Sequence, residues 1–201
     1  MKAEEATVDE PGSSSIQVHY ISGNFLIFSK RDATRLEDEL HILPKAVFGS
    51  EDEESYCLSP EQVLLLVQHG YAEVVVRSSA AASSESYRRL HQYDIPVPCS
   101  REFRARQLVY HDLWSRGYYL TSGEQFGVAW LVYEGLPGDV HATFMVDFHL
   151  NDSSPSLMNL IALVRIAVQA KKTMVLAVVS PDTCRPHYLA LDWLRSHAAE
   201  E

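Results

Sequence analysis

The sequence has few cysteines and no long hydrophobic run, and each shortage excludes a class of protein. Its 201 residues include only three cysteines, Cys57, Cys99 and Cys184. An odd number of widely spaced cysteines argues against a disulfide framework and favours a reducing compartment. No apolar run approaches the ~18 residues that a membrane-spanning helix needs, so we expect no membrane insertion. The first fifteen residues are acidic and polar, unlike a secretory signal peptide.

Positive charge is also scarce. The chain carries 17 lysines and arginines against 27 aspartates and glutamates, a net charge of −10. Residues 1–100 hold 8 basic and 16 acidic residues, whereas residues 101–201 hold 9 and 11, so most of the acidic excess lies in the first half. Because nucleic-acid affinity rests largely on neutralising phosphates, an acidic chain binds a polyanion weakly by itself. If this protein acts on RNA or DNA, partner proteins must supply most of the positive field.

Common catalytic and metal-binding motifs are missing. The nine histidines and three cysteines show no C-x-x-C, H-x-x-x-H or H-E-x-x-H spacing. No glycine-rich loop has the spacing of a phosphate-binding loop, and no G-x-S-x-G nucleophile motif occurs. The sequence therefore predicts neither a resident metal nor a cofactor.

Two separately patterned segments predict an α/β protein with two modules. Residues 1–15 are polar and aperiodic, which predicts a disordered tail. Residues 16–77 suggest two strands around Gly23, a helix capped by Asp32, a helix starting at Ser59, and a further strand. A Ser- and Ala-rich linker, residues 78–100, then leads to a second module at 101–201.

The second module alternates helical and strand patterns. A helix from Ser100 to Gly117 comes first, and apolar residues at helical spacing predict another at 157–170. Three neighbouring segments suit antiparallel strands, and two more follow the second helix. The predicted strands are 118–122, 126–133, 141–148, 173–180 and 186–194.

Two side chains that can transfer protons flank one predicted hairpin, VYEGLPGDVHATF. Tyr133 ends the strand before a Pro-Gly-Asp turn, and His141 opens the strand after it. Taken alone, such a tyrosine is usually a half-buried packing residue and such a histidine a surface residue. Likewise, Lys171 and Lys172 at a helix end usually complement the helix dipole. Spacing alone therefore favours a structural role for these residues.

Several linked segments, however, resemble the tRNA-splicing endonuclease family, and in particular its eukaryotic catalytic subunit for the 3′ splice site. They are DLWSRGYYLTSGEQFG, VYEGLPGDVHATF, LVRIAVQAKKTMVLAV and LDWL, in the family's order and spacing over roughly residues 108–195. ISGNFLIFSKRDATRL and LSPEQVLLLVQHGYAEVVV resemble that subunit's small N-terminal domain more weakly. The resemblance implies a small α/β N-terminal module and a mixed-sheet α/β nuclease domain of the tRNA-intron endonuclease type.

The resemblance assigns Tyr133, His141 and Lys172 to a catalytic triad, with Lys172 chosen over Lys171 because it adjoins the following strand. It implies metal-free cleavage. Tyr133 removes the proton of the ribose 2′-OH, His141 protonates the departing 5′-oxygen, and Lys172 stabilises the transition state. The products would be a 2′,3′-cyclic phosphate and a 5′-OH. Because a free tyrosine titrates near ~10, either Lys172 makes Tyr133 an effective base or Tyr133 only orients the 2′-OH.

The resemblance also assigns Arg165 and Trp193 to a clamp on a base flipped out of the intron bulge. An unpaired base can be held between an indole face and a guanidinium plane. The clamp could serve its own active site or that of a partner. The structural alternatives are a solvated arginine and a core tryptophan.

The implied substrate is precursor tRNA. The implied partners are a structural subunit and a second catalytic subunit with its own partner, in a heterotetramer. The implied location is the nucleus, with the cytoplasm or the mitochondrial outer surface as alternatives. Two other interpretations stay open: a non-catalytic or 5′-site subunit of the same complex, and a protein-interaction module that shares only the fold.

Overall fold

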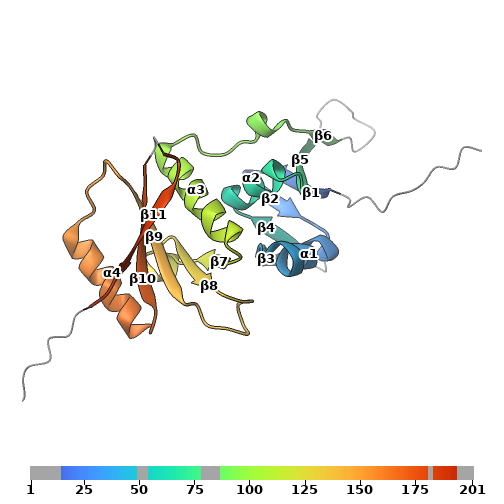
Figure 1. The fold of residues 1–201 in the computed structure, drawn as a ribbon. Helices are drawn as coiled ribbons and strands as arrows, with labels where there is room; N and C mark the ends of the chain where they lie inside the picture. Colours follow the sequence, from blue (N-terminus) through green and yellow to red (C-terminus); the bar gives the residue numbers. More distant parts are fainter. Residues whose placement is uncertain (1–14, 49–53, 78–86, 181–182, 194–201) are drawn as a thin grey trace, which may run out of the picture.

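A computed structural model of the chain describes residues 15–48, 54–77, 87–180 and 183–193. These residues form two mixed β-sheets with four α-helices packed around them (Figure 1), as the predicted α/β class requires. Most of the predicted tail and the first part of the predicted linker lie outside the described residues. None of the helices in the described ranges is long and apolar enough to cross a membrane.

The first sheet has six strands in the order β3-β4-β2-β1-β5-β6, in which only β1 and β5 run parallel. Two helices accompany it. The elements are β1 (Ile16–Ile21), β2 (Asn24–Ile27), α1 (Lys30–Leu40), β3 (Lys45–Phe48), β4 (Glu54–Leu58), α2 (Pro60–Gln68), β5 (Ala72–Arg77) and β6 (Tyr87–Arg89).

Side-chain caps set where both helices of this part begin. Ser59 and Gln62 form a complete capping box at α2, so the predicted start is confirmed. Helix α1, in contrast, starts at Lys30 rather than after Asp32, because the Ser29 hydroxyl accepts the backbone N–H of Asp32. Asp32 instead lies in the first turn, where its carboxylate suits the positive end of the helix dipole.

The sequence reading did not predict three short strands. Strands β3 and β4 pair with each other, and the residues between them, 49–53, lie outside the described part. Strand β6 falls inside the predicted linker, and all three of its residues are exposed. Strand β6 is held in place by backbone pairing with β5. Because this pairing needs no buried side chains, the sequence of β6 shows no hydrophobic pattern.

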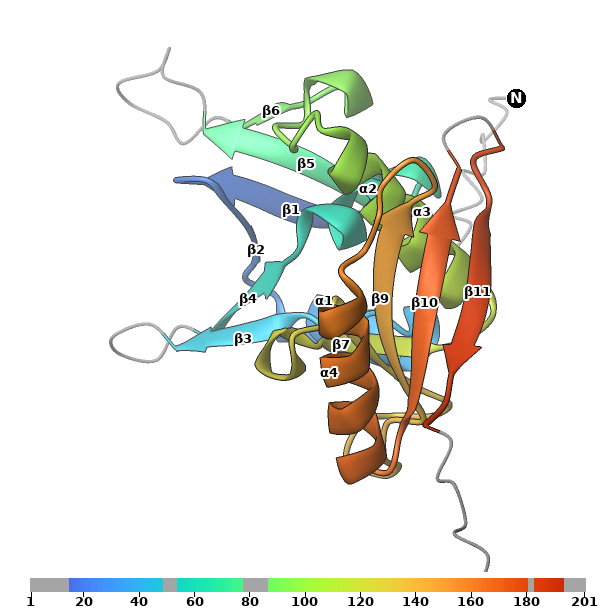
Figure 2. The same cartoon turned by 90° about the vertical axis from the view of Figure 1, so that its left-hand side faces the viewer.

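The second sheet has five strands in the order β11-β10-β9-β8-β7, with β9 and β10 parallel and the other neighbours antiparallel. Helices α3 and α4 cover its opposite faces (Figure 2). The elements are η1 (Gln92–Asp94), α3 (Arg101–Ser115), β7 (Tyr119–Ser122), η2 (Glu124–Phe126), β8 (Trp130–Tyr133), β9 (Phe144–Leu150), α4 (Leu157–Gln169), β10 (Thr173–Val179) and β11 (Pro186–Leu191).

The predicted antiparallel order of the three segments before α4 is confirmed, although two strands start later than expected. The turn η2 takes up the first residues of the predicted strand 126–133, and Gly127 ends that turn with φ 75°. Strand β9 begins at Phe144 rather than at His141. Strand β11 ends at Leu191, so Trp193 lies two residues beyond it.

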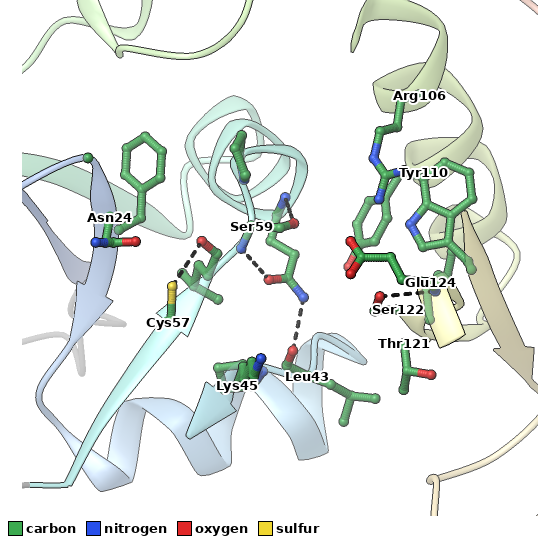
Figure 3. A pocket seen from close by; sticks show the side chains of 18 residues that line it. Asn24, Leu43, Lys45, Cys57, Ser59, Arg106, Tyr110, Thr121, Ser122 and Glu124 are labelled. Carbon is green, nitrogen blue, oxygen red and sulfur yellow. Dashed lines mark hydrogen bonds between the residues drawn. The ribbon is translucent and has the colours of Figure 1, made fainter. Parts of the chain in front are cut away.

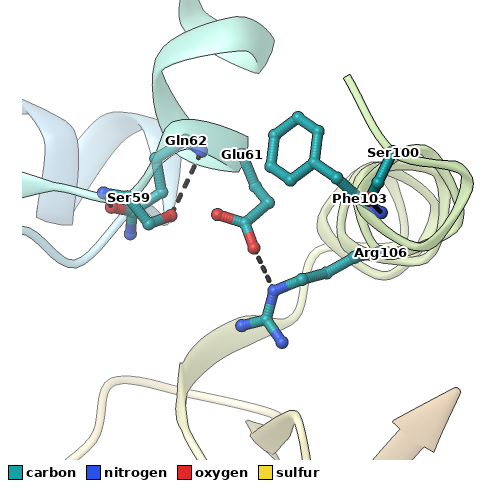
Figure 4. A network of polar contacts seen from close by, with 6 residues as sticks. All are labelled: Ser59, Glu61, Gln62, Ser100, Phe103 and Arg106. Atoms are coloured by element: carbon teal, nitrogen blue, oxygen red, sulfur yellow. Dashed lines mark hydrogen bonds and ion pairs between the residues drawn. The ribbon is translucent and has the colours of Figure 1, made fainter. Parts of the chain in front are cut away.

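Helix α3 lies between the two sheets and belongs to both halves of the core (Figure 1). Its Val109 and Tyr110 share one hydrophobic cluster with Val63 of α2 and Val132 of β8. A charged contact strengthens this junction. Glu61 of α2, only 4% exposed, accepts a hydrogen bond from Arg106 of α3 (Figure 4).

The composition of the predicted linker leads to an expected result in limited proteolysis. The first cut should fall between residues 78 and 90, because small polar residues dominate that stretch. Since α3 joins both halves of the core, the two fragments should stay together in gel filtration and separate only in denaturant. Full protection of this stretch, or fragments that separate without denaturant, would contradict the expectation.

Candidate active site

The connection between β8 and β9 contains the predicted tight turn. Pro137 and Val140 form an isolated bridge, and the carbonyl of Leu136 accepts the N–H groups of Asp139 (3.1 Å) and Val140 (3.3 Å). Gly138 takes φ 112°, which favours glycine. His141 follows this turn and is exposed to solvent, three residues before β9 begins. It therefore lies on the loop at the strand's entrance rather than within the strand.

The strand register places Tyr133 and Lys172 in one row. Strand β8 pairs Val132 with Phe144, and β9 pairs Phe144 with Thr173. The N–H of Thr143 donates to the Val132 carbonyl (2.9 Å), and the N–H of Thr173 donates to the Thr143 carbonyl (3.1 Å), so both bonds belong to this last paired position. Tyr133 directly follows Val132, whereas Thr143 and Lys172 directly precede Phe144 and Thr173, and the three residues form a row at one end of the sheet.

One member of this row faces helix α4. Tyr133 packs into the cluster beneath α4, together with Leu131, Met145 and Met174. Figure 2 shows the starts of β9 and β10 together at one end of the sheet, beside the end of α4. His141, two residues before Thr143 in the chain, lies at this same end of the sheet.

The end of helix α4 fixes the backbone of Lys172. The N–H of Lys172 donates to the Ala167 carbonyl (2.9 Å), and the N–H of Lys171 donates to the Val168 carbonyl (3.1 Å). Lys171 has φ 54°, so this is a Schellman motif with lysine in the position usually held by glycine. The motif explains why two adjacent lysines differ. Lys171 takes the left-handed conformation that turns the chain, whereas the half-buried Lys172 follows the turn and lies directly before β10.

Two side chains of the predicted triad, Tyr133 and Lys172, are each held by a neighbouring residue. The hydroxyl of Thr121 donates to the Tyr133 hydroxyl oxygen at 3.5 Å, and the Lys172 ammonium donates to the Ala170 carbonyl at 3.4 Å. Within the described residues, Tyr133, His141 and Lys172 share no hydrogen bond with one another. Their groups could therefore act on separate atoms of one substrate.

Thr121 also lines a cleft of about 530 Å³ between the two sheets (Figure 3). Lys45 and Cys57 line the cleft from the first sheet, and Arg106 lines it from α3. Burial raises the pKa of the Cys57 thiol, which keeps it protonated and poorly nucleophilic. No three His, Cys, Asp or Glu side chains of the described ranges are grouped so that they could hold a metal ion.

Arg165 and Trp193, the predicted base clamp, are in direct contact. The guanidinium carbon of Arg165 lies 5.0 Å from the centre of the Trp193 ring, and both side chains are exposed. A base between two flat groups needs about 7 Å, twice an ordinary ~3.5 Å contact. The pair is therefore too close to hold a base without moving apart. It lies near the row, since β11 pairs Leu191 with Met174, two residues after Lys172.

Replacing either member of this pair with alanine should reduce RNA processing by roughly one to two orders of magnitude. Stacking of a base on an aromatic side chain is worth about 1–3 kcal/mol. Single-turnover cleavage of an intron-containing tRNA by Arg165→Ala and Trp193→Ala variants would measure the loss. Arg116→Ala is the matched control, because Arg116 makes a similar contact with Tyr188 at 5.7 Å elsewhere on the chain. Full activity in folded Arg165 and Trp193 variants would disprove the clamp.

Sequence reasoning missed Thr121 and Thr143. Neither residue stands out in the sequence, because threonine is common in strands. Only the pairing of β7 with β8 brings the Thr121 hydroxyl beside Tyr133, and only the parallel pairing of β9 with β10 brings Thr143 beside Thr173.

Known proteins that are similar in sequence to this chain share one family. Residues 103–185 match the family model of the tRNA intron endonuclease catalytic C-terminal domain. A tRNA-splicing endonuclease of Hyperthermus butylicus is 30% identical over 132 residues, which is 66% of this chain and 70% of that protein. One from Thermococcus gammatolerans is 30% identical over 183 residues, which is 89% of this chain and 98% of that protein.

A human relative, tRNA-splicing endonuclease subunit Sen34, is 30% identical over 105 residues. That match takes in 52% of this chain but only 34% of the human protein. The fold, the nuclease-domain match and the full-length archaeal relatives define an endonuclease of RNA processing. The chain belongs to the tRNA-splicing endonuclease family.

Proposed function

We propose that this chain is a catalytic subunit that cleaves precursor tRNA at the 3′ splice site and leaves a 2′,3′-cyclic phosphate and a 5′-OH. Tyr133 takes the proton of the ribose 2′-OH, whose oxygen attacks the adjacent phosphorus. His141 protonates the 5′-oxygen as its bond to phosphorus breaks. Lys172 stabilises the extra negative charge that develops on the phosphate oxygens.

The observation that carries this proposal is the row at the end of the second sheet. Tyr133 ends β8, His141 and Thr143 lie just before β9, and Lys172 lies just before β10, so these residues are all at the same end of the sheet, which supports the proposal. A non-catalytic subunit or an interaction module would need none of these groups at one point. The row therefore favours a catalytic subunit over a non-catalytic subunit or an interaction module, and the choice of the 3′ site over the 5′ site rests on the family resemblance.

The partners and location that we propose follow from the acidic charge and from the relatives. With a net charge of −10, the chain alone binds tRNA weakly. We propose that it joins a structural subunit and a second catalytic subunit with its own partner, as a heterotetramer in the nucleus. The human relative is itself described as a subunit.

The deciding experiment is co-expression with candidate partner subunits, followed by an intron-excision assay. The reconstituted assembly should release the intron, whereas the purified chain should cut poorly or not at all. End-group analysis should find a 2′,3′-cyclic phosphate on the upstream product. A 3′-hydroxyl at that position, or site-specific cleavage by the chain alone, would contradict the proposal.

Cleavage should continue in excess chelator, provided that monovalent salt or a polyamine keeps the tRNA folded. The physical reason is that Tyr133, His141 and Lys172 together supply a base, an acid and a positive charge. Single-turnover rates with and without chelator should agree. A rate that falls in chelator and recovers only on adding a divalent ion, with tRNA folding unchanged, would show that the reaction needs a metal.

A further inference from the structure

We infer that Thr121 is a positioning residue that holds the hydroxyl of Tyr133 for the reaction, an inference that rests on the proposed function. The hydroxyl of Thr121 donates to the phenolic oxygen of Tyr133 at 3.5 Å. Both side chains are half-buried. No other hydrogen bond to the Tyr133 hydroxyl is found among the described residues.

The register explains how this contact forms. Strand β7 pairs Tyr119 with Tyr133 and Thr121 with Leu131. Thr121 is thus the diagonal neighbour of Tyr133 on the same face, a separation that a long aromatic side chain can bridge. The ring of Tyr133 consequently extends toward β7, away from β9 and β10.

This direction separates the base from the acid. Displacement at phosphorus brings the attacking and leaving oxygens roughly in line on opposite sides. Thr121 keeps the phenolic oxygen on the β7 side of β8, whereas His141 enters from the β9 side. A scissile phosphate over β8 and β9 would then have its 2′-oxygen toward Tyr133 and its 5′-oxygen toward His141.

The donor direction has a second consequence. Because the Thr121 hydroxyl donates, the phenolic oxygen receives a proton donor that stabilises negative charge on it. The remaining lone pairs of the phenolate oxygen are left to accept the proton of the ribose 2′-OH.

The test compares three variants of the full chain in the reconstituted assembly. Thr121→Val keeps the shape and the strand preference but removes the hydroxyl, and should lower kcat about 2- to 10-fold, the usual effect of one hydrogen bond, with KM unchanged. Thr121→Ser restores a hydroxyl and should recover the rate. Thr34→Val, which removes an exposed hydroxyl on α1, is the control and should have no effect.

A double-mutant cycle then shows whether Thr121 acts through Tyr133. In a Tyr133→Phe background, the Thr121→Val change should add no further loss. An equal loss in that background, or no loss from Thr121→Val or Thr121→Ala in the parent, would overturn the positioning role. If Tyr133→Phe itself cleaves at the parental rate, the proposed chemistry of Tyr133 fails instead. Melting temperatures of all variants would confirm that each one is folded.

Discussion

Replacing His141 with alanine should slow cleavage at the 3′ splice site by about 10²–10⁴-fold, the usual effect of losing a general acid. Without an imidazole at the entrance of β9, no positioned group protonates the departing 5′-oxygen. Cutting at the 5′ splice site should persist, because in our proposal another subunit performs it. The assembly should therefore accumulate a half-cut species in which the intron and the 3′ exon stay joined.

Gel analysis of the reaction products separates the possible outcomes. His149→Ala is a matched control, since His149 lies further along β9 and contacts Ser153 instead of the row. This control should process both sites normally. A His141→Ala variant that loses the 5′ cut would assign the chain to the other catalytic role, and one that loses neither cut would remove His141 from the site.

Replacing Glu61 with alanine should lower the free energy of unfolding by about 1–3 kcal/mol, the cost of removing one partner of a hydrogen-bonded charge pair. Glu61 is 4% exposed, whereas the side chain of its partner Arg106 is 32% exposed and would lose its acceptor between α2 and α3. Arg106 also lies over the ring of Trp130 at 4.6 Å, so the loss should loosen the second sheet as well. Urea unfolding of the full chain would measure the effect.

Two comparison variants make this result interpretable. Asp152→Ala removes the partner of Arg101 in an exposed pair and should change stability little. A double change, Glu61→Leu with Arg106→Met, replaces both charges with apolar groups and should recover much of the loss. If Glu61→Ala is no more destabilising than Asp152→Ala, the buried pair does not stabilise the junction.

Local chemistry made much of the fold predictable. The Ser59 and Gln62 capping box and the helical period of α4 are encoded within a few neighbouring residues. Strands β3, β4 and β6 were missed because they are short and are held mainly by backbone pairing. His141 was expected to open β9, but the turn after Pro137 and the burial of Ala142 delay the ladder until Phe144.

The site was predictable only in part, for a related reason. The family resemblance supplied Tyr133, His141, Lys172, Arg165 and Trp193, but not how they are supported. The support of Tyr133 by Thr121 depends on the pairing of β7 with β8, and the turn at Lys171 depends on how α4 ends. The first contact joins residues far apart in the sequence, and the second depends on the φ angle of one residue. No local sequence pattern predicts either of them.

Helix α4 carries Arg165, and the turn at its end leads to Lys172, so in our proposal the helix is a rigid spacer between base capture and bond cleavage. Arg165 lies four residues before the last helical residue, Gln169, about 6 Å along the helix axis. Buried Val164 and Ala167 anchor the helix side, whereas Trp193 follows the last paired residue of β11. In our proposal, an arriving base would displace Trp193 and leave the helix in place. The helix would then fix the distance between the bound base and the scissile phosphate, so cleavage would depend on the shape of the folded RNA.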